Sequence, residues 1–444
     1  MRLFAASALA VLALPAFVRA GHVAPAPPPV VTVRVSNPSI SPNDDGVRDR
    51  TRIEVSVDSK ATLSVAVDDA HGAVVTSLVS AQPVGAGRQE LAWNGKGSGG
   101  RVADGPYTVV ANAVGPGGAE GRATAPVSVD TTAPRVTWLG PSARRVFRGV
   151  LPIDVVVGDA LSSRAHLRLT LRDQTGRKIT DFAPSPRPLG ALRLGWHPSS
   201  GLPSGAYRVE VRVTDDAGNI GATGPRPFLV ERHAHPRTVA HVDDAGRKVA
   251  LTFDDCGSQA AWASILRTLR DRGVKAAFFC PGIYVLAAPD LARETVRDGH
   301  TIGSHGWDHV NFRGLSSSEA RKRLVADREV WWRLARVAPT PFFRPPYGAY
   351  TRATYAVAGT VGYSDFVLWD VDPSDWKDPG VRVIVARVLR AVRPGSIVLL
   401  HVKPQTASAL PAILRGLLAK RLEPVALADL LHAGRPTALH WPAY

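Results

Sequence analysis

The sequence predicts a multidomain protein in which two all-β sandwiches precede an α/β barrel. Two observations support this prediction. In the first half of the chain, short alternating strands are separated by glycine, proline and aspartate turns, and one pattern occurs twice. Beyond about residue 240, apolar runs alternate with helical stretches, as they do around a parallel sheet. At 444 residues, the chain is long enough for about three domains of roughly 150 residues each.

The first residues have the features of a secretory signal. Arg2 precedes the apolar run Leu3–Val18, and Val18-Arg19-Ala20 places small or aliphatic residues where a signal peptidase reads the chain. The run is shorter than the roughly 20 residues that span a bilayer, although an uncleaved anchor stays open. We therefore expect a signal peptide over residues 1–20, a proline-rich linker over 21–30, and no membrane span once the signal is removed. The expected location is secreted, at the cell surface or in the periplasm.

The chain is strongly basic. It has 54 Lys and Arg against 38 Asp and Glu, a formal net charge of +16. Such a charge attracts anionic polymers. Because the sequence contains no RNA- or DNA-binding motif, we expect an anionic cell-wall polymer rather than a specific nucleic acid as partner. The alternative is a soluble charged surface with no specific partner. The sequence indicates no oligomeric state.

The first half of the chain contains a tandem repeat. Ile53–Val57 and Tyr107–Val110 are typical of its short alternating strands. A strand that ends in Trp and is followed by a turn and a Tyr occurs twice, roughly one hundred residues apart: Gly87–Trp93 with Asp104–Tyr107, and Gly190–Trp196 with Ser204–Tyr207. This spacing predicts two sandwich domains, over residues 31–130 and 131–232.

The alternation of apolar runs and helical stretches over residues 240–444 predicts the barrel. The clearest helical stretches are Ala260–Arg272 and Ser317–Leu334. Seven apolar runs are expected to be strands: Val249–Phe253, Ala276–Phe279, Thr301–Gly303, Phe342–Phe343, Phe366–Val371, Ser396–Leu400 and Pro424–Leu427. Polar residues with catalytic potential follow the carboxyl ends of several runs, where parallel barrels collect their active-site residues.

Three of these polar residues suit a metal. Asp255, His305 and His309 form an Asp/His/His set that fits zinc, or as a second candidate cobalt, with positions open for water and substrate. Side chains alternate across a strand end, so Asp254 and Asp255 cannot both face the metal in the same way. Asp254 is then left as a base, and His401 from the far end of the chain can act as an acid.

Five motifs in order resemble the polysaccharide deacetylase family, the NodB homology domain of carbohydrate esterase family 4. They are Thr252-Phe253-Asp254-Asp255, His305-x-x-x-His309, Arg344-Pro345-Pro346-Tyr347, Asp375-Trp376 and Leu399-Leu400-His401. The resemblance covers about residues 245–432 and implies a distorted seven-stranded (β/α) barrel. Two positions depart from the family pattern: Cys256 stands where glycine is usual, and Gly306 where a hydroxyl residue is usual.

The resemblance implies a role for each motif residue. Asp255, His305 and His309 would bind the metal, and Asp254 would deprotonate the attacking water while Arg344 keeps it ionised. The resemblance also implies that the backbone N–H of Tyr347 would donate to the oxyanion and that His401 would act as the acid. Trp376 and Leu399 would form the walls of a pocket for the acetyl methyl group.

A carboxylate is expected to hold His401 protonated. Asp375 is the residue that the resemblance implies, and Asp370 and Asp372 stay open for the same role because they lie close in the sequence.

The turns of the first half are similar to those of bacterial immunoglobulin-like modules. The two turns are Ser41–Gly46 and Asp215–Asn219, and the first is similar to the flagellar hook-cap type. The sandwiches are therefore expected to be immunoglobulin-like.

These observations together predict a metal-dependent hydrolase that removes N-acetyl groups from peptidoglycan or another N-acetylglucosamine polymer. Two alternatives stay open: an O-acetyl esterase acting on xylan-like polysaccharide, and a catalytically weak protein that binds the wall through its sandwiches.

The two cysteines follow the first and second barrel runs. Neighbouring parallel strands lie roughly 4.8 Å apart, and a disulfide accepts Cα separations of about 4.4 to 6.8 Å. Secretion would supply an oxidising compartment. We therefore predict a Cys256–Cys280 disulfide. Two buried thiols, or Cys256 as an additional metal ligand, are the alternatives.

Overall fold

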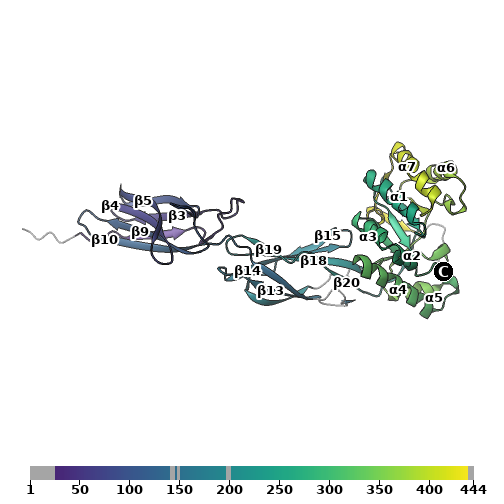
Figure 1. The fold of residues 1–444 in the computed structure, drawn as a ribbon, viewed down its shortest axis with the longest axis horizontal. Coiled ribbons are helices and arrows are strands. Elements are labelled where there is room, and N and C mark those ends of the chain that lie inside the picture. Colours follow the sequence, from purple (N-terminus) through teal and green to yellow (C-terminus); the bar gives the residue numbers. More distant parts are fainter. Residues whose placement is uncertain (1–25, 141–145, 148–150, 197–201, 439–444) are drawn as a thin grey trace, which may run out of the picture. The chain divides into compact units, whose positions relative to one another are not determined.

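The computed structural model describes residues 26–140, 146–147, 151–196 and 202–438. The predicted signal peptide lies outside the described residues. The chain divides into two compact units, the first formed by residues up to 132 together with 216–219 and the second by all others (Figure 1). Each unit is described by itself.

The first unit contains two main sheets. Their strand orders are β1-β3-β6 and β2-β10-β9-β4-β5. Along β3, Ile53, Val55 and Val57 are buried and alternate with exposed or half-buried residues, as expected when one face of a strand meets a core. The strands are β1 Val31–Val35, β2 Ser39–Ile40, β3 Thr51–Val57, β4 Ala61–Asp68, β5 Val74–Val84, β6 Gly87–Trp93, β7 Lys96–Gly97, β8 Gly100–Arg101, β9 Gly105–Val114 and β10 Glu120–Val129.

The second unit begins with sheets of the same strand order. Here β11-β13-β17 corresponds to β1-β3-β6, and β12-β20-β18-β14-β15 corresponds to the second sheet of the first unit. The hydroxyls of Tyr107 and Tyr207 each donate to a backbone carbonyl four residues upstream, both at 2.8 Å. The sequence repeat therefore has a matching repeat in strand order. The strands are β11 Arg135–Gly140, β12 Val146–Phe147, β13 Leu151–Gly158, β14 Arg164–Asp173, β15 Lys178–Phe182, β16 Arg187–Pro188, β17 Gly190–Trp196, β18 Gly205–Thr214, β19 Ile220–Ala222 and β20 Arg226–Val230.

A curled parallel sheet forms the rest of the second unit. Its order is β21-β27-β26-β25-β24-β23-β28, with β29 paired to β23. The strands are β21 Arg237–Val239, β23 Lys248–Asp254, β24 Ala277–Cys280, β25 Thr301–Ser304, β26 Phe342–Phe343, β27 Asp365–Val367, β28 Ile397–His401 and β29 Glu423–Pro424, with β22 His241–Asp243 and β30 Arg435–Thr437 forming a separate antiparallel pair.

Helices connect the parallel strands and lie outside the sheet (Figure 1). Helix α4 begins with a capping box, in which Ser316 and Glu319 satisfy each other's backbone N–H groups. The helices are α1 Gln259–Asp271, α2 Gly282–Ala287, α3 Pro289–Arg297, α4 Ser317–Ala335, α5 Arg352–Thr360, α6 Val381–Ala391, α7 Pro404–Ala419 and α8 Leu427–Ala433; short 3₁₀ turns are η1 Phe312–Gly314, η2 Pro346–Gly348 and η3 Asp375–Lys377. No helix among the described residues is both long and apolar enough to cross a bilayer.

The strands of the sheet differ from the expected ones at two places. Of the run expected over Pro424–Leu427, only Pro424 lies in a strand, the two-residue β29, and Leu427 already begins α8. The sheet instead gains β21, which begins at Arg237, before the expected start of the barrel domain. This strand has three residues and follows a polar, histidine-containing segment, so no periodicity marks it. Pairing with β27 specifies it.

Within the second unit, the β-rich part packs against α4. Trp332 is 2 % exposed and clusters with Ala206 and Leu229 from the β-rich part. Nη1 of Arg328 lies 2.7 Å from Oε1 of Glu231, which follows β20. A buried indole and an ion pair therefore join the β-rich part to α4.

Candidate functional site

A cavity of about 440 Å³ lies at the carboxyl edge of the parallel sheet. In parallel α/β proteins, active-site residues lie at this edge of the sheet. Its lining combines acidic, imidazole and aromatic groups: Asp254, Asp255, His305, His309, Pro345, Tyr347, Gly348, Trp369, Asp372, Trp376, Leu399 and His401.

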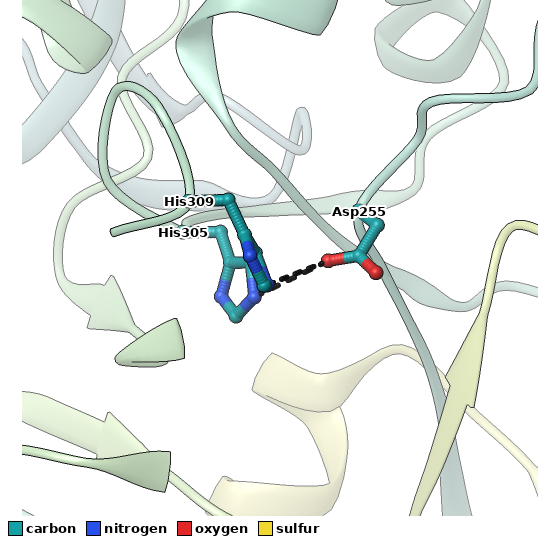
Figure 2. A group of neighbouring side chains, drawn as sticks. All are labelled: Asp255, His305 and His309. Atoms are coloured by element: carbon teal, nitrogen blue, oxygen red, sulfur yellow. Dashed lines mark ion pairs between the residues drawn. The ribbon is translucent and has the colours of Figure 1, made fainter. Parts of the chain in front are cut away.

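Three side chains in this cavity converge on one point (Figure 2). Oδ1 of Asp255 lies 3.1 Å from Nε2 of His309 and 3.6 Å from Nε2 of His305. One potential ligand atom from each residue lies within 4.8 Å of the others. Oδ1 of Asp255 is buried and makes no hydrogen bond to any described residue. A divalent cation would satisfy this oxygen, so the donor set fits a metal with Asp/His/His ligands.

The electrostatics of the ligands suit a cation. Burial raises the pKa of Asp255, but the adjacent imidazoles of His309, His305 and His401 outweigh this effect and bring the pKa to about 2. Burial lowers the pKa of His305, which keeps the imidazole neutral. An ionised carboxylate and a neutral imidazole are the forms that bind metals.

The backbone carbonyl of Arg344 fixes the orientation of His305. Nδ1 of His305 lies 2.7 Å from this oxygen, so Nδ1–H donates and Nε2 is left to face the cation. His309, at φ 55°, packs edge-on against Tyr347 with ring centroids 4.8 Å apart.

Asp254 ends β23 and is held by the guanidinium of Arg344. Nη1 of Arg344 donates to Oδ1 of Asp254 at 2.7 Å, and also to Thr252 Oγ1 at 2.8 Å. The guanidinium is fully buried and also donates to the carbonyls of Val367 and Leu368. One oxygen of Asp254 is thus held by a charge-assisted bond, while the side chain faces the cavity.

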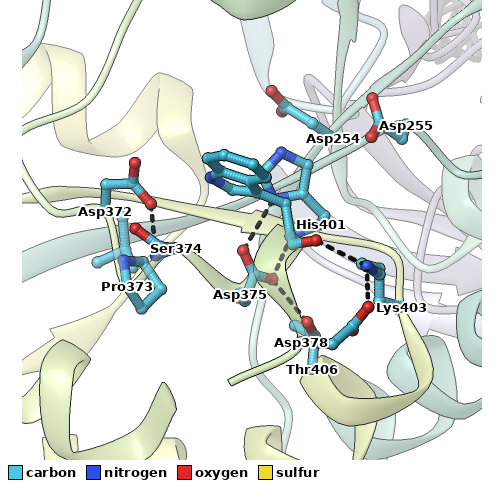
Figure 3. A network of polar contacts seen from close by, with 12 residues as sticks. Asp254, Asp255, Asp372, Pro373, Ser374, Asp375, Asp378, His401, Lys403 and Thr406 are labelled. Atoms are coloured by element: carbon cyan, nitrogen blue, oxygen red, sulfur yellow. Dashed lines mark hydrogen bonds and ion pairs between the residues drawn. The ribbon is translucent and has the colours of Figure 1, made fainter. Parts of the chain in front are cut away.

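His401 is paired with Asp375 (Figure 3). Nδ1 of His401 lies 2.8 Å from Oδ1 of Asp375, whose Oδ2 accepts from the backbone N–H of His401 and from Thr406 Oγ1. Burial lowers the pKa of His401, but the hydrogen bond and charge of Asp375, together with the charges of Asp254 and Asp255, outweigh this and raise it. His401 can therefore carry a proton facing the cavity.

The two other aspartates considered as partners of His401 accept hydrogen bonds from other groups. Asp370 accepts from the backbone N–H of Ile397, where β28 begins, and lies 2.9 Å from Nδ1 of His241. Asp372 lines the cavity, but its Oδ1 accepts from the backbone N–H of Ser374 (Figure 3).

The remaining predicted residues also reach the cavity. Leu399 is buried, whereas Trp376 is 50 % exposed and Tyr347 is 68 % exposed, which places both aromatic rings at the rim. Tyr347 has φ 61°, and its backbone N–H makes no hydrogen bond to another described residue. This N–H is therefore available as a donor.

Sequence reasoning missed three supporting residues. Thr252 belongs to the first motif, and its hydroxyl accepts a hydrogen bond from Arg344 and donates one to the carbonyl of Val398. Thr406 holds Asp375 from α7, and Trp369 lines the cavity. No spacing signal points to Thr406, because its contact depends on how α7 packs. Trp369 belongs to a predicted strand run whose end faces the site.

The structure shows what surrounds the two residues that depart from the family pattern, Cys256 and Gly306. The Sγ atoms of Cys256 and Cys280 are bonded, so Cys256 offers no thiolate to a metal. Gly306 has φ 76°, and a Cβ built there would lie 2.9 Å from the ring of Phe312, so a larger residue would be strained here.

Sequence comparisons agree with both resemblances. The family described as "Polysaccharide deacetylase" matches residues 241–366, and that described as "FlgD Ig-like domain" matches residues 38–117. A peptidoglycan-N-acetylglucosamine deacetylase of Listeria monocytogenes is 33 % identical over 50 % of this chain and 46 % of its own length. A chitooligosaccharide deacetylase of Bradyrhizobium is 38 % identical over 35 % of this chain and 70 % of its own length.

Among solved structures, a family 4 carbohydrate esterase from Streptomyces lividans is 29 % identical, covering 44 % of this chain and 98 % of the esterase with a TM-score of 0.40. The chain spans about half the length of the Listeria relative that it matches.

Proposed function

The chain belongs to the polysaccharide deacetylase family, and on this premise we propose that it is a metal-dependent hydrolase that removes N-acetyl groups from a cell-wall or extracellular polysaccharide. One observation carries the proposal: a held base, Asp254, and a paired acid, His401, face the same cavity as the Asp/His/His ligand set.

The proposed substrate is peptidoglycan or another N-acetylglucosamine polymer. The names of the relatives, a peptidoglycan-N-acetylglucosamine deacetylase and a chitooligosaccharide deacetylase, support this class. Action on such a polymer fits an extracellular or surface location, in line with the predicted signal over residues 1–20 and the net charge of +16.

Asp255, His305 and His309 would hold the metal, for which we propose zinc. When bound, such an ion lowers the pKa of a coordinated water and polarises the substrate carbonyl.

The chain's own residues would then move the protons. Asp254, held by Arg344, takes the proton from the attacking water. The backbone N–H of Tyr347 donates to the developing oxyanion. His401, kept protonated by Asp375, gives a proton to the leaving nitrogen so that the sugar departs as a neutral amine. Leu399 and Trp376 shape the wall against which the acetyl methyl group lies.

We assign the β-rich part to two immunoglobulin-like sandwiches and the curled sheet to a distorted seven-stranded barrel. The matching strand orders of the two β-rich parts support the first assignment. The parallel pairing of seven strands in one path supports the second. The role proposed for the sandwiches is contact with anionic wall polymer.

The test is an acetate-release assay on N-acetylglucosamine oligomers, peptidoglycan and acetylated xylan, with protein stripped by a chelator and reloaded with zinc or cobalt. We expect release from the first two substrates only, lost on stripping and restored on reloading. His305→Ala should bind no zinc and release no acetate. Acetate from xylan alone would favour the esterase, and no acetate from any substrate by the zinc-loaded protein would reject the proposal.

A further inference from the structure

The disulfide between Cys256 and Cys280 lies directly beside the metal ligands. Cys256 follows Asp255, and Cys280 ends the neighbouring strand β24, with a Cα–Cα separation of 5.2 Å. Both cysteines are buried. We propose that this disulfide is a positioning element of the metal site, which holds the backbone of Asp255 and Cys256 in the conformation that directs Asp255 towards the two histidines. The inference rests on the metal-binding part of the proposed function.

The backbone at this point is in an unfavourable conformation. Asp255 has φ 75° and Cys256 has φ 56°, two successive left-handed residues that both carry a Cβ. Few backbone hydrogen bonds support them: Asp255 N–H donates to Phe279 O at 3.2 Å, and Cys256 N–H donates to Asp254 O at 3.0 Å. Such a conformation persists only where the surroundings impose it. The bond to Cys280 is the covalent constraint at this position.

The other end of the disulfide connects to the histidine ligands. Cys280 is in register with Ser304, the residue before His305, in the parallel pair β24–β25. Beyond the strand ends, two backbone hydrogen bonds of 3.0 Å continue the connection: Gly282 N–H to Gly306 O, and Ile283 N–H to Trp307 O. Gly306 and Trp307 belong to the segment between the two histidines. The disulfide thus joins the loop of Asp255 to β24, the neighbour of the strand β25 that leads into the His305–His309 segment.

This geometry makes glycine and alanine at position 256 a matched comparison. Both variants lack the disulfide. Glycine adopts positive φ without the Cβ clash, so it can keep the conformation unaided, whereas alanine favours relaxation to negative φ. Relaxation would turn Asp255 away from His305 and His309 in the metal-free protein, and zinc binding would have to restore it.

The experiment measures zinc affinity, without substrate, by competition with a chromogenic chelator. The proteins are the oxidised wild type, Cys256→Ala/Cys280→Ala and Cys256→Gly/Cys280→Ala, each checked for folding by circular dichroism. We expect the alanine pair to bind zinc about tenfold more weakly than the wild type, and the glycine variant to stay within roughly threefold of it. If the alanine pair does not fold, the glycine variant alone tests the role of the backbone conformation, because a large loss of zinc affinity in this variant would overturn that part of the proposal.

Equal zinc affinity in all three proteins would overturn the positioning role, whatever happens to their melting temperatures. Equal weakening of both variants would overturn the part assigned to the backbone conformation. Because no substrate is present, a zinc-loaded wild type that releases no acetate would count against the proposed function and not against this inference.

Discussion

The buried imidazole of His300 should make the second unit sensitive to acid. His300 precedes β25, is 4 % exposed, and accepts a hydrogen bond from the backbone N–H of Ala276 through Nδ1 at 3.2 Å. Burial, with the nearby charge of Lys275, lowers its pKa from 6.5 to about 4. Between these values the unfolded chain binds a proton that the folded protein does not, so stability is complete above pH 6.5 and falls as the pH drops towards 4.

The size of the effect follows from the two pKa values. A fall from 6.5 to about 4 corresponds to about 3 kcal/mol of unfolding free energy. The entropy of unfolding scales with the number of residues, so for the second unit this is a decrease in melting temperature on the order of 5 °C. The assay is thermal unfolding at pH 7 and pH 4 for the wild type, His300→Gln, and the exposed control His432→Gln.

His300→Gln removes the titrating group, so its melting temperature should change less between the two pH values than that of the wild type, although other groups contribute to both. The control His432→Gln should behave as the wild type does. An equal pH-dependent decrease in His300→Gln and the wild type would refute the reasoning, because the acid sensitivity would then arise elsewhere.

Three further outcomes follow from the site and the fold. Asp254→Asn should bind zinc normally and lose about two to four orders of magnitude in acetate release; undiminished turnover would move the base to another residue. His401→Ala should lose more activity on amides than on activated esters, whose leaving groups need no proton, and equal losses would make His401 structural. Removing residues 21–132 should leave hydrolysis of short oligomers intact. Removing residues 21–232 should in addition lower the melting temperature, because it exposes Trp332 and takes away the ion-pair partner of Arg328. Identical melting curves for the two truncated proteins would contradict this prediction.

Much of the site was predictable because strand ends of a parallel sheet meet at one edge. The apolar runs located the ends of β23, β25 and β28, and the polar residues that follow them converge in one cavity. The partner of His401 was not predictable in the same way. Asp370, Asp372 and Asp375 lie within six positions, and only the path of the chain beside β28 separates them. Asp370 lies beside Ile397 at the start of that strand, and Asp375 beside His401 at its end.

Local irregularities escaped prediction for a different reason. β21 consists of three residues whose pairing with β27 decides their conformation. The left-handed residues Asp255, His309 and Tyr347 are not glycines, so their residue types do not indicate a positive φ. Each is held there by contacts that form only in the folded protein, in keeping with the tendency of such outliers to gather at functional sites.

The groups proposed to transfer protons and the proposed metal ligands are therefore positioned by different means. Asp254 and His401 are register partners in the parallel pair β23–β28, so the ladder itself sets the base and the acid side by side. Asp255 and His309 lie outside any ladder, in loops with positive φ, and depend on the disulfide and on packing against Tyr347. A perturbation of the loops should thus weaken metal binding first, whereas the relation between base and acid should persist until the sheet unfolds.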